Sequence, residues 1–138
     1  MSNYLSLHEA VVIASKASEC TLDLIRGKKI MYRGKMLNGE TITYCFPYSK
    51  FHHAQGCYWV DITKVQVETM NETDKGTILF RLEGNKVMGV KWADFKEHLT
   101  DDCMRYSKAA GHHWKLHIFH DHINIRGNPN RFFSSIMS

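Results

Sequence analysis

A histidine-rich segment between residues 114 and 126 carries most of the side chains in this sequence that could do chemistry. Its sequence is Trp-Lys-Leu-His-Ile-Phe-His-Asp-His-Ile-Asn-Ile-Arg. Imidazoles titrate near neutral pH, so His117 and His122 are candidate catalytic residues for proton transfer. Lys115 or Arg126 would stabilise the negative charge that develops when a phosphodiester is cleaved. One hypothesis is therefore acid/base hydrolysis without a metal.

A divalent metal site is a second hypothesis for the same segment. Imidazole nitrogens and carboxylate oxygens are common ligands of zinc and similar ions. The candidate ligands are His117, His122 and Asp121. Further histidines that could approach them are His52, His53, His112 and His113. The sequence contains no His-Glu-x-x-His motif and no close pair of cysteines, so exposed histidines without a metal remain the alternative.

Binding of nucleic acid or another polyanion, without catalysis, requires the least special geometry. Cations would hold phosphates while flat rings stack on bases. The predicted binding residues are Lys50, His52, His53, Lys115, Asn124 and Arg126. The formal net charge is +4 with neutral histidines, which permits an anionic partner without requiring one. The aromatic residues nearby, including Phe132 and Phe133, would more commonly pack in a core.

The sequence contains no diagnostic catalytic signature, so it leaves open whether the protein is an enzyme. The main alternatives to a nucleic-acid-binding domain are a histidine-based hydrolase, nuclease-like and with or without a metal, and a small protein-binding inhibitor or adaptor. Seven methionines and an exposed aromatic would suit a protein partner. An uncovered strand edge would also permit a homodimer.

A β-hairpin must position these residues. A two-residue turn at His120 and Asp121 predicts that Ile118 pairs with Ile123 and that His117 pairs with Asn124. Because side chains alternate along a strand, this register predicts two different faces. The inner face would hold Leu116, Ile118, Ile123 and Ile125, preceded by Trp114. The outer face would hold Lys115, His117, Phe119, His122, Asn124 and Arg126.

The remaining pattern predicts helices at both ends of a run of strands. Ser6 and Glu9 fit a capping box, and apolar periodicity extends the first helix to Ile25 before Gly27. A second helix would follow Trp92 and close at Gly111. The predicted strands are 30–33, 41–46, 57–62, 77–82 and 86–90. We expect a loop at 48–56, while 63–70 fits a strand or a short helix equally well.

Together these elements predict an α+β fold, with a mainly antiparallel sheet of about five to seven strands and two helices packed on one face. The 138 residues fit one globular domain. The four cysteines lie far apart and are expected to be reduced core thiols. No apolar run is long enough to cross a bilayer and no secretory signal is evident, so we expect a cytoplasmic protein that does not enter the membrane.

Overall fold

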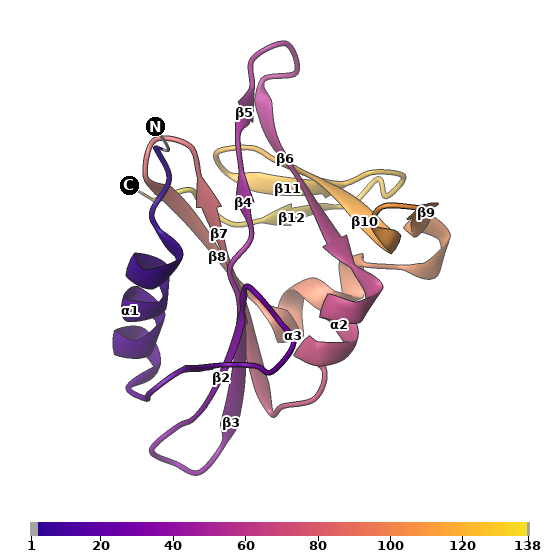
Figure 1. Ribbon diagram of the computed structural model, residues 1–138. Helices are drawn as coiled ribbons and strands as arrows, with labels where there is room; N and C mark the ends of the chain where they lie inside the picture. The colour runs from indigo at the N-terminus through magenta and orange to yellow at the C-terminus, as the bar shows by residue number, and fades with distance from the viewer. Residues whose placement is uncertain (1–2, 138) are drawn as a thin grey trace.

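The computed structural model describes residues 3–137, and its framework is two six-stranded β-sheets (Figure 1). Sheet A contains β1 (Asp23–Leu24), β2 (Met31–Lys35), β3 (Thr41–Cys45), β4 (Tyr48–Ser49), β7 (Lys75–Leu82) and β8 (Lys86–Lys91). Sheet B contains β5 (Phe51–His52), β6 (Cys57–Thr63), β9 (Arg105–Ser107), β10 (Gly111–Ile118), β11 (His122–Ile125) and β12 (Arg131–Phe133).

Most neighbouring strands in both sheets are antiparallel. In sheet A the order is β1-β2-β3-β7, and β7 also pairs with β4 and β8. The parallel pairs are β3 with β7 and β4 with β7. In sheet B the order is β12-β11-β10-β6-β5, and β9 also pairs with β10. The predicted α+β class and mainly antiparallel pairing are confirmed, with the strands divided between two sheets.

Within residues 3–137, three α-helices pack against these sheets: α1 (Leu7–Ser18), α2 (Lys64–Met70) and α3 (Trp92–Phe95). Helix α1 lies on one side of sheet A, and α2 and α3 lie on its other side (Figure 1). Helix α2 also contacts β6 and β10. None of the helices formed by the described residues is both long enough and apolar enough to cross a bilayer.

Helix α1 begins as predicted but ends seven residues before Ile25, at Ser18. Its capping box is present, because the Ser6 hydroxyl accepts from the Glu9 N–H and the Glu9 carboxylate accepts from the Ser6 N–H. Glu19 then takes a left-handed conformation with φ of 53° and ends the helix. Gly27, the predicted C-terminal stop, instead lies in the connection between β1 and β2.

The predicted second helix is also wrong beyond its first turn. After Phe95 the chain forms 3₁₀ turns at Lys96–His98 and Asp101–Cys103. The Trp114 indole N–H donates to the Thr100 carbonyl over 2.7 Å, which ties this irregular segment to β10. Residues that continue the helical spacing, such as Tyr106, belong to β9, because pairing with β10 satisfies their backbone groups.

The segments 48–56 and 63–70 position the site. The first was predicted as a loop, but it holds β4, which pairs with sheet A, and β5, which pairs with sheet B. The chain therefore crosses between sheets at Lys50. The second is helix α2, which a capping box of Thr63 and Gln66 initiates.

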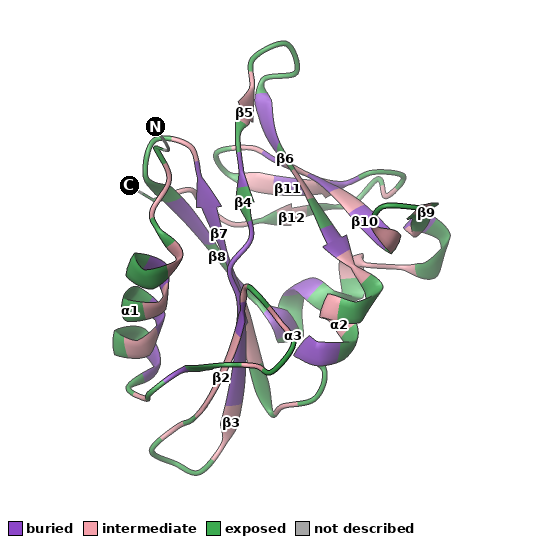
Figure 2. Cartoon of the chain, viewed as in Figure 1, coloured by how far each residue is buried: buried purple, intermediate pink, exposed green. Residues whose placement is uncertain are grey.

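The largest group of buried side chains draws on both sheets, and Figure 2 shows buried segments in the strands of each sheet. It includes the inward residues of the His-rich hairpin, which are at most 3% exposed: Trp114, Leu116, Ile118, Ile123 and Ile125. The C-terminal segment also joins the sheets. Met137 exchanges backbone hydrogen bonds with Val87 of β8, and the Ile136 N–H donates to the His120 carbonyl beside β11.

Candidate binding face on sheet B

The hairpin formed by β10 and β11 has the predicted register. Its paired residues are Leu116 with Ile125, His117 with Asn124, and Ile118 with Ile123. The Phe119 N–H donates to the His122 carbonyl over 2.8 Å, which closes the two-residue turn. The Arg126 N–H donates to the Lys115 carbonyl over 2.9 Å at the other end. The hairpin therefore separates aliphatic from polar side chains as predicted.

The outward side chains of five strands form one surface, which we call the sheet B face. It consists of His52 on β5, Trp59 and Asp61 on β6, Lys115, His117 and Phe119 at β10, His122, Asn124 and Arg126 at β11, and Arg131 and Phe133 on β12. The aliphatic side of the same hairpin is buried, whereas these residues are half-buried or exposed. The polar groups are thus available to a ligand.

A row of three rings crosses the sheet B face. The His52 imidazole stacks on the Trp59 indole, with 4.6 Å between ring centroids and 20° between ring planes. On the other side of Trp59, the His117 imidazole lies with its centroid 5.4 Å away and its plane tilted by 30°. Strand β6 lies between β5 and β10, which brings these rings together. Trp59 is 43% exposed although it is large and apolar.

A second group of rings lies at the turn end of the hairpin. The Phe119 ring stacks on the His122 imidazole, with 4.6 Å between centroids and 12° between planes. Phe133 lies on the other side of His122, at 6.1 Å between centroids, and is 70% exposed. The His122 Nδ1 is 2.7 Å from a carboxylate oxygen of Asp121, and this hydrogen bond lowers the pKa of Asp121.

The charges on the sheet B face are mostly positive. Lys115 Nζ lies 3.6 Å from a carboxylate oxygen of Asp61, directly opposite on β6. Lys50, Arg126 and Arg131 are exposed and form no ion pair with any residue among 3–137. Burial, followed by the nearby charges of Arg126 and Lys115, lowers the pKa of His117. The neutral form of this imidazole is therefore favoured near neutral pH.

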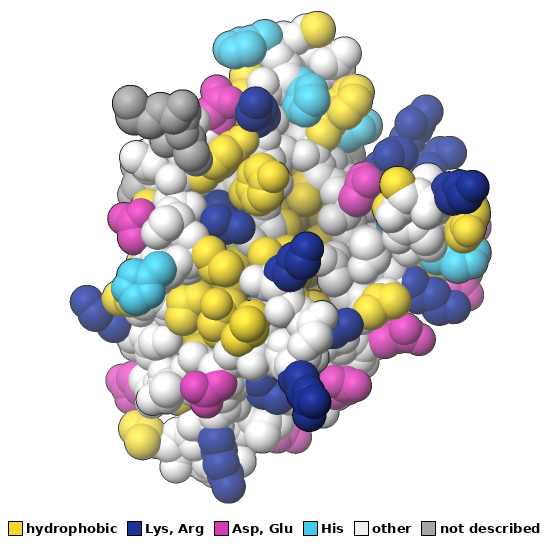
Figure 3. Space-filling model, viewed as in Figure 1, with side chains coloured by type: hydrophobic (Ala, Val, Ile, Leu, Met, Phe, Trp, Pro, Cys, Tyr) yellow, Lys and Arg dark blue, Asp and Glu magenta, His cyan; other side chains and the backbone are white. Residues whose placement is uncertain are grey.

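Two hollows meet at Trp59 and Lys115. One, of about 570 Å³, is lined by Tyr48, Lys50, His52 and further residues of β4 and β6. The other, of about 410 Å³, extends along β10 to His117 and Arg126. In Figure 3, histidine side chains gather around the β5–β6 hairpin and Lys or Arg side chains lie beside it. The two hollows form a path that runs across the row of rings.

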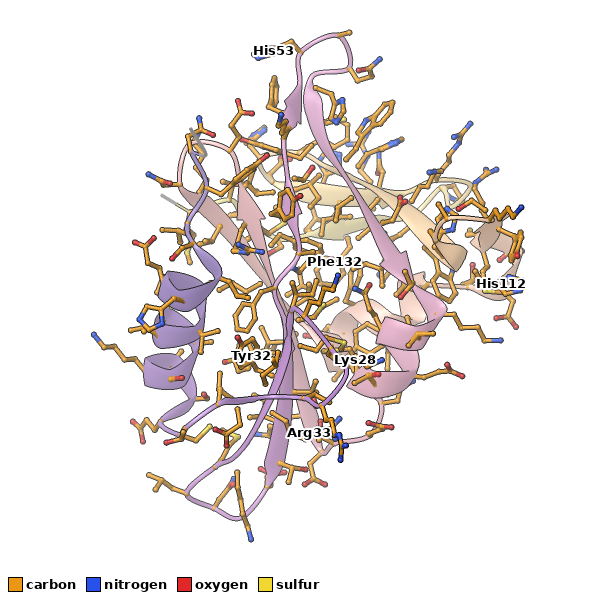
Figure 4. All side chains as sticks on the ribbon, in the orientation of Figure 1. Lys28, Tyr32, Arg33, His53, His112 and Phe132 are labelled. Carbon is orange, nitrogen blue, oxygen red and sulfur yellow. The ribbon has the colours of Figure 1, made fainter. Side chains whose placement is uncertain are left out.

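The structure brings together most of the predicted binding residues. Lys50 and His52 lie beside Trp59, and Asn124 is paired with both His117 and Arg131. His53 is the exception, because it lies at the exposed tip of the β5–β6 hairpin (Figure 4).

The histidines considered as additional metal ligands are also dispersed. His112 lies beside β9, far along β10 from the hairpin turn (Figure 4). His113 is only 2% exposed, and its Nδ1 lies 2.8 Å from the Gly111 carbonyl oxygen. No group of three or more His, Cys, Asp or Glu side chains that could hold a metal ion occurs within residues 3–137. Of the predicted ligands, Asp121 contacts His122, while His117 lies on the row of rings with Trp59.

Two aromatic residues of the sheet B face were not predicted from the sequence. Trp59 was assigned only to a strand, although alternation from Cys57 to Thr63 would have placed it outward with Asp61. Phe133 was expected in a core, and the expectation holds only for its neighbour Phe132, which packs against the buried cluster (Figure 4). Strand β12 is too short for its sequence pattern to distinguish the two phenylalanines.

Comparison with known proteins found no match to this chain among family models, curated proteins or solved structures.

Proposed function

We propose that the sheet B face binds single-stranded nucleic acid. The observation that carries this proposal is the row of His52, Trp59 and His117, whose rings lie on one open sheet face. Beside it lie Lys50 and Arg126, which form no ion pair among residues 3–137. Bases stack on such rings whatever their sequence, because every base has a π-face. The proposal therefore predicts binding with modest sequence preference.

Positive side chains lie beside the rings, where they can attract phosphates. Arg126 and Lys115 line the hollow next to His117, and Lys50 lines the hollow next to His52. Cations placed along both sides of a ring platform can follow a phosphate backbone while the bases reach the rings. Asp61 opposes this attraction in part, since its carboxylate lies 3.6 Å from the Lys115 ammonium.

A single strand fits this arrangement better than a duplex. In a duplex the flat faces of the bases are stacked on one another, so they cannot stack on the rings of this row. A duplex would use only the cations, and such binding weakens steeply with salt. The rings should therefore give single strands an advantage that persists as salt rises.

Fluorescence anisotropy with labelled single-stranded RNA, single-stranded DNA and their duplexes, at two salt concentrations, tests the proposal. We expect the single strands to bind more tightly at both concentrations. A variant in which Lys115, His117 and Arg126 are all replaced by Ala should keep its circular dichroism spectrum, because these side chains point outward. It should lose most of the binding. Unchanged affinity of this variant for every DNA and RNA tested would reject the proposal.

One observation favours phosphodiester hydrolysis as a second candidate function. His117 has a lowered pKa and lies near the cations Lys115 and Arg126, so its neutral imidazole could accept a proton while either cation stabilises charge on phosphate. We would incubate the protein with single-stranded RNA and compare His117→Asn with the wild-type chain. Cleavage that disappears in this variant would support catalysis, whereas equal cleavage by both proteins would exclude His117 as the base.

A further inference from the structure

A second cavity, of about 380 Å³, lies at one end of sheet A and shares no residue with the hollows on the sheet B face. It is bounded by the end of α1, the strands β3 and β7, the end of β8, and the start of α3. Its apolar lining residues are Ala17, Met36, Ile42, Met70, Trp92 and Ala93. A cavity of this size, which combines these apolar residues with polar and charged ones, is suited to a small molecule.

The charged residues at this cavity favour an anion. Three lysines and one aspartate line it: Lys75, Lys91, Lys96 and Asp74. Lys75 is paired with Glu40, at 3.4 Å between the ammonium nitrogen and a carboxylate oxygen. Asp74 accepts hydrogen bonds from the backbone and the hydroxyl of Thr41.

Two of these lysines have no partner of opposite charge among the described residues. Lys91 and Lys96 are exposed and form no ion pair within the part of the chain that the structure describes. They leave the cavity with positive charge that a ligand could neutralise.

Tyr44 supplies a hydrogen-bonding group beside the apolar lining. Its side chain stacks on Phe46, with 5.6 Å between ring centroids, and the residue is 6% exposed. Its hydroxyl has no hydrogen-bond partner among residues 3–137. Thr77 on β7, which is paired with Tyr44 on β3 and with Lys91 on β8, also lines the cavity. Polar groups such as these, placed beside apolar residues, orient a ligand in its site.

We propose that this cavity binds a small organic anion with an apolar body. The body packs against Ile42, Met70 and the residues around them, while the acidic group lies toward Lys91 and Lys96 and accepts a hydrogen bond from Tyr44. The cavity is separate from the sheet B face, so ligand binding in it does not depend on whether that face binds nucleic acid.

Two dyes that differ in charge provide a matched test of this proposal. Anilinonaphthalene sulfonate carries an anionic group on an aromatic body, and phenylnaphthylamine has the same rings without that group. We expect the sulfonate to bind saturably, one molecule per chain, and about tenfold more tightly than the neutral dye. Equal affinity for the two dyes, or a fluorescence increase that never saturates, would overturn the proposal.

Substitutions then assign the binding to this cavity. The double variant Lys91→Gln and Lys96→Gln should weaken sulfonate binding about two- to fivefold per lysine and leave the neutral dye unaffected. Tyr44→Phe should weaken it about tenfold, because a hydrogen bond to a charged group is lost. Lys108→Gln, which removes an exposed lysine outside both this cavity and the sheet B face, is the control and should leave the affinity for both dyes unchanged. Unchanged sulfonate affinity in the double lysine variant, or an equal loss in Lys108→Gln, would refute the assignment.

Backbone amide chemical shifts provide a readout of position that does not depend on any variant. Addition of the sulfonate dye should shift the amide signals of Thr77 and Ala93, which line the cavity, before those of Trp59 and His117. Shifts confined to the sheet B face would contradict the proposal.

Discussion

The His52 imidazole and the Trp59 indole are stacked with 4.6 Å between their centroids, although they come from different strands. This pair leads to the first prediction. Trp59→Ala removes the middle ring, which holds His52 and His117 in the row, so it should weaken binding of single-stranded nucleic acid by about 1–3 kcal/mol, on the order of one base stacked on an aromatic ring. Duplex binding should change far less. Anisotropy titrations of both ligands would measure the difference.

Tyr106 offers a matched control for Trp59. It is 69% exposed and lies beside His112, with 5.0 Å between ring centroids, but it is outside the sheet B face. Tyr106→Ala should bind single strands as the wild-type protein does. A loss of equal size in both variants would show that the row of rings has no special role.

The ion pair of Lys115 with Asp61 predicts that one substitution on the sheet B face will strengthen nucleic-acid binding. Asp61→Asn removes a negative charge from the proposed path of the phosphates, so binding should become about two- to fivefold tighter at low salt. Lys115→Gln should weaken binding and reduce the slope of affinity against salt by about one phosphate contact. Glu72→Gln, which breaks an exposed ion pair with Arg33 elsewhere, is the control. Weaker binding by Asp61→Asn would contradict the proposed path.

His117 should make stability depend on pH in a definite direction. Its pKa is lower in the folded protein than the ordinary value of 6.5, so the unfolded chain binds more protons as the solution becomes acidic. The free energy of unfolding should therefore fall as the pH decreases through that value toward the folded pKa. His117→Gln removes this contribution, and urea unfolding at neutral and mildly acidic pH should show a smaller decrease.

Arg126→Gln provides a second check on that mechanism. The charge of Arg126 is one of the causes that lower the pKa of His117, after burial. Its removal should recover part of the pH-dependent loss while His117 is still present. An unaltered pH dependence in both variants would show that another group is responsible.

Leu116 and Lys115 are neighbours on β10 but face opposite sides of sheet B. Leu116 is fully buried, so Leu116→Ala should reduce the free energy of unfolding by about 2–5 kcal/mol. Lys115→Ala removes an outward side chain and should change it by less than about 0.5 kcal/mol. Chemical denaturation of the two variants measures both effects. Similar losses would mean that the hairpin does not separate a core side from a ligand side.

The His-rich hairpin could be predicted in detail because three local signals agree. The turn at His120 and Asp121 fixes which residues pair, strict alternation fixes the faces, and the β-branched residues Ile118 and Ile123 favour strands. The start of helix α1 was equally accessible, since Ser6 and Glu9 satisfy each other's neighbouring backbone groups.

The predictions that failed concern features that depend on contacts between residues distant in sequence. Nothing local shows that Tyr48 and Ser49 will pair with β7, or that Phe51 and His52 will pair with β6. The helical spacing of Phe95, Leu99 and Tyr106 was likewise overridden, because the β9 backbone pairs with β10. Alternation also places His113 outward with Lys115, yet it is buried where α2 contacts β10.

The row of rings combines two residues of the β5–β6 hairpin with a third from β10, which is synthesised much later. His52 and Trp59 emerge early, and His117 joins them only after β10 has docked on β6. A fragment that stops before β10 would carry two of the rings with no flanking Lys115 or Arg126. Ligand binding by this face would therefore serve as a reporter of completed folding, and a nascent chain should not compete for nucleic acid before that strand is in place.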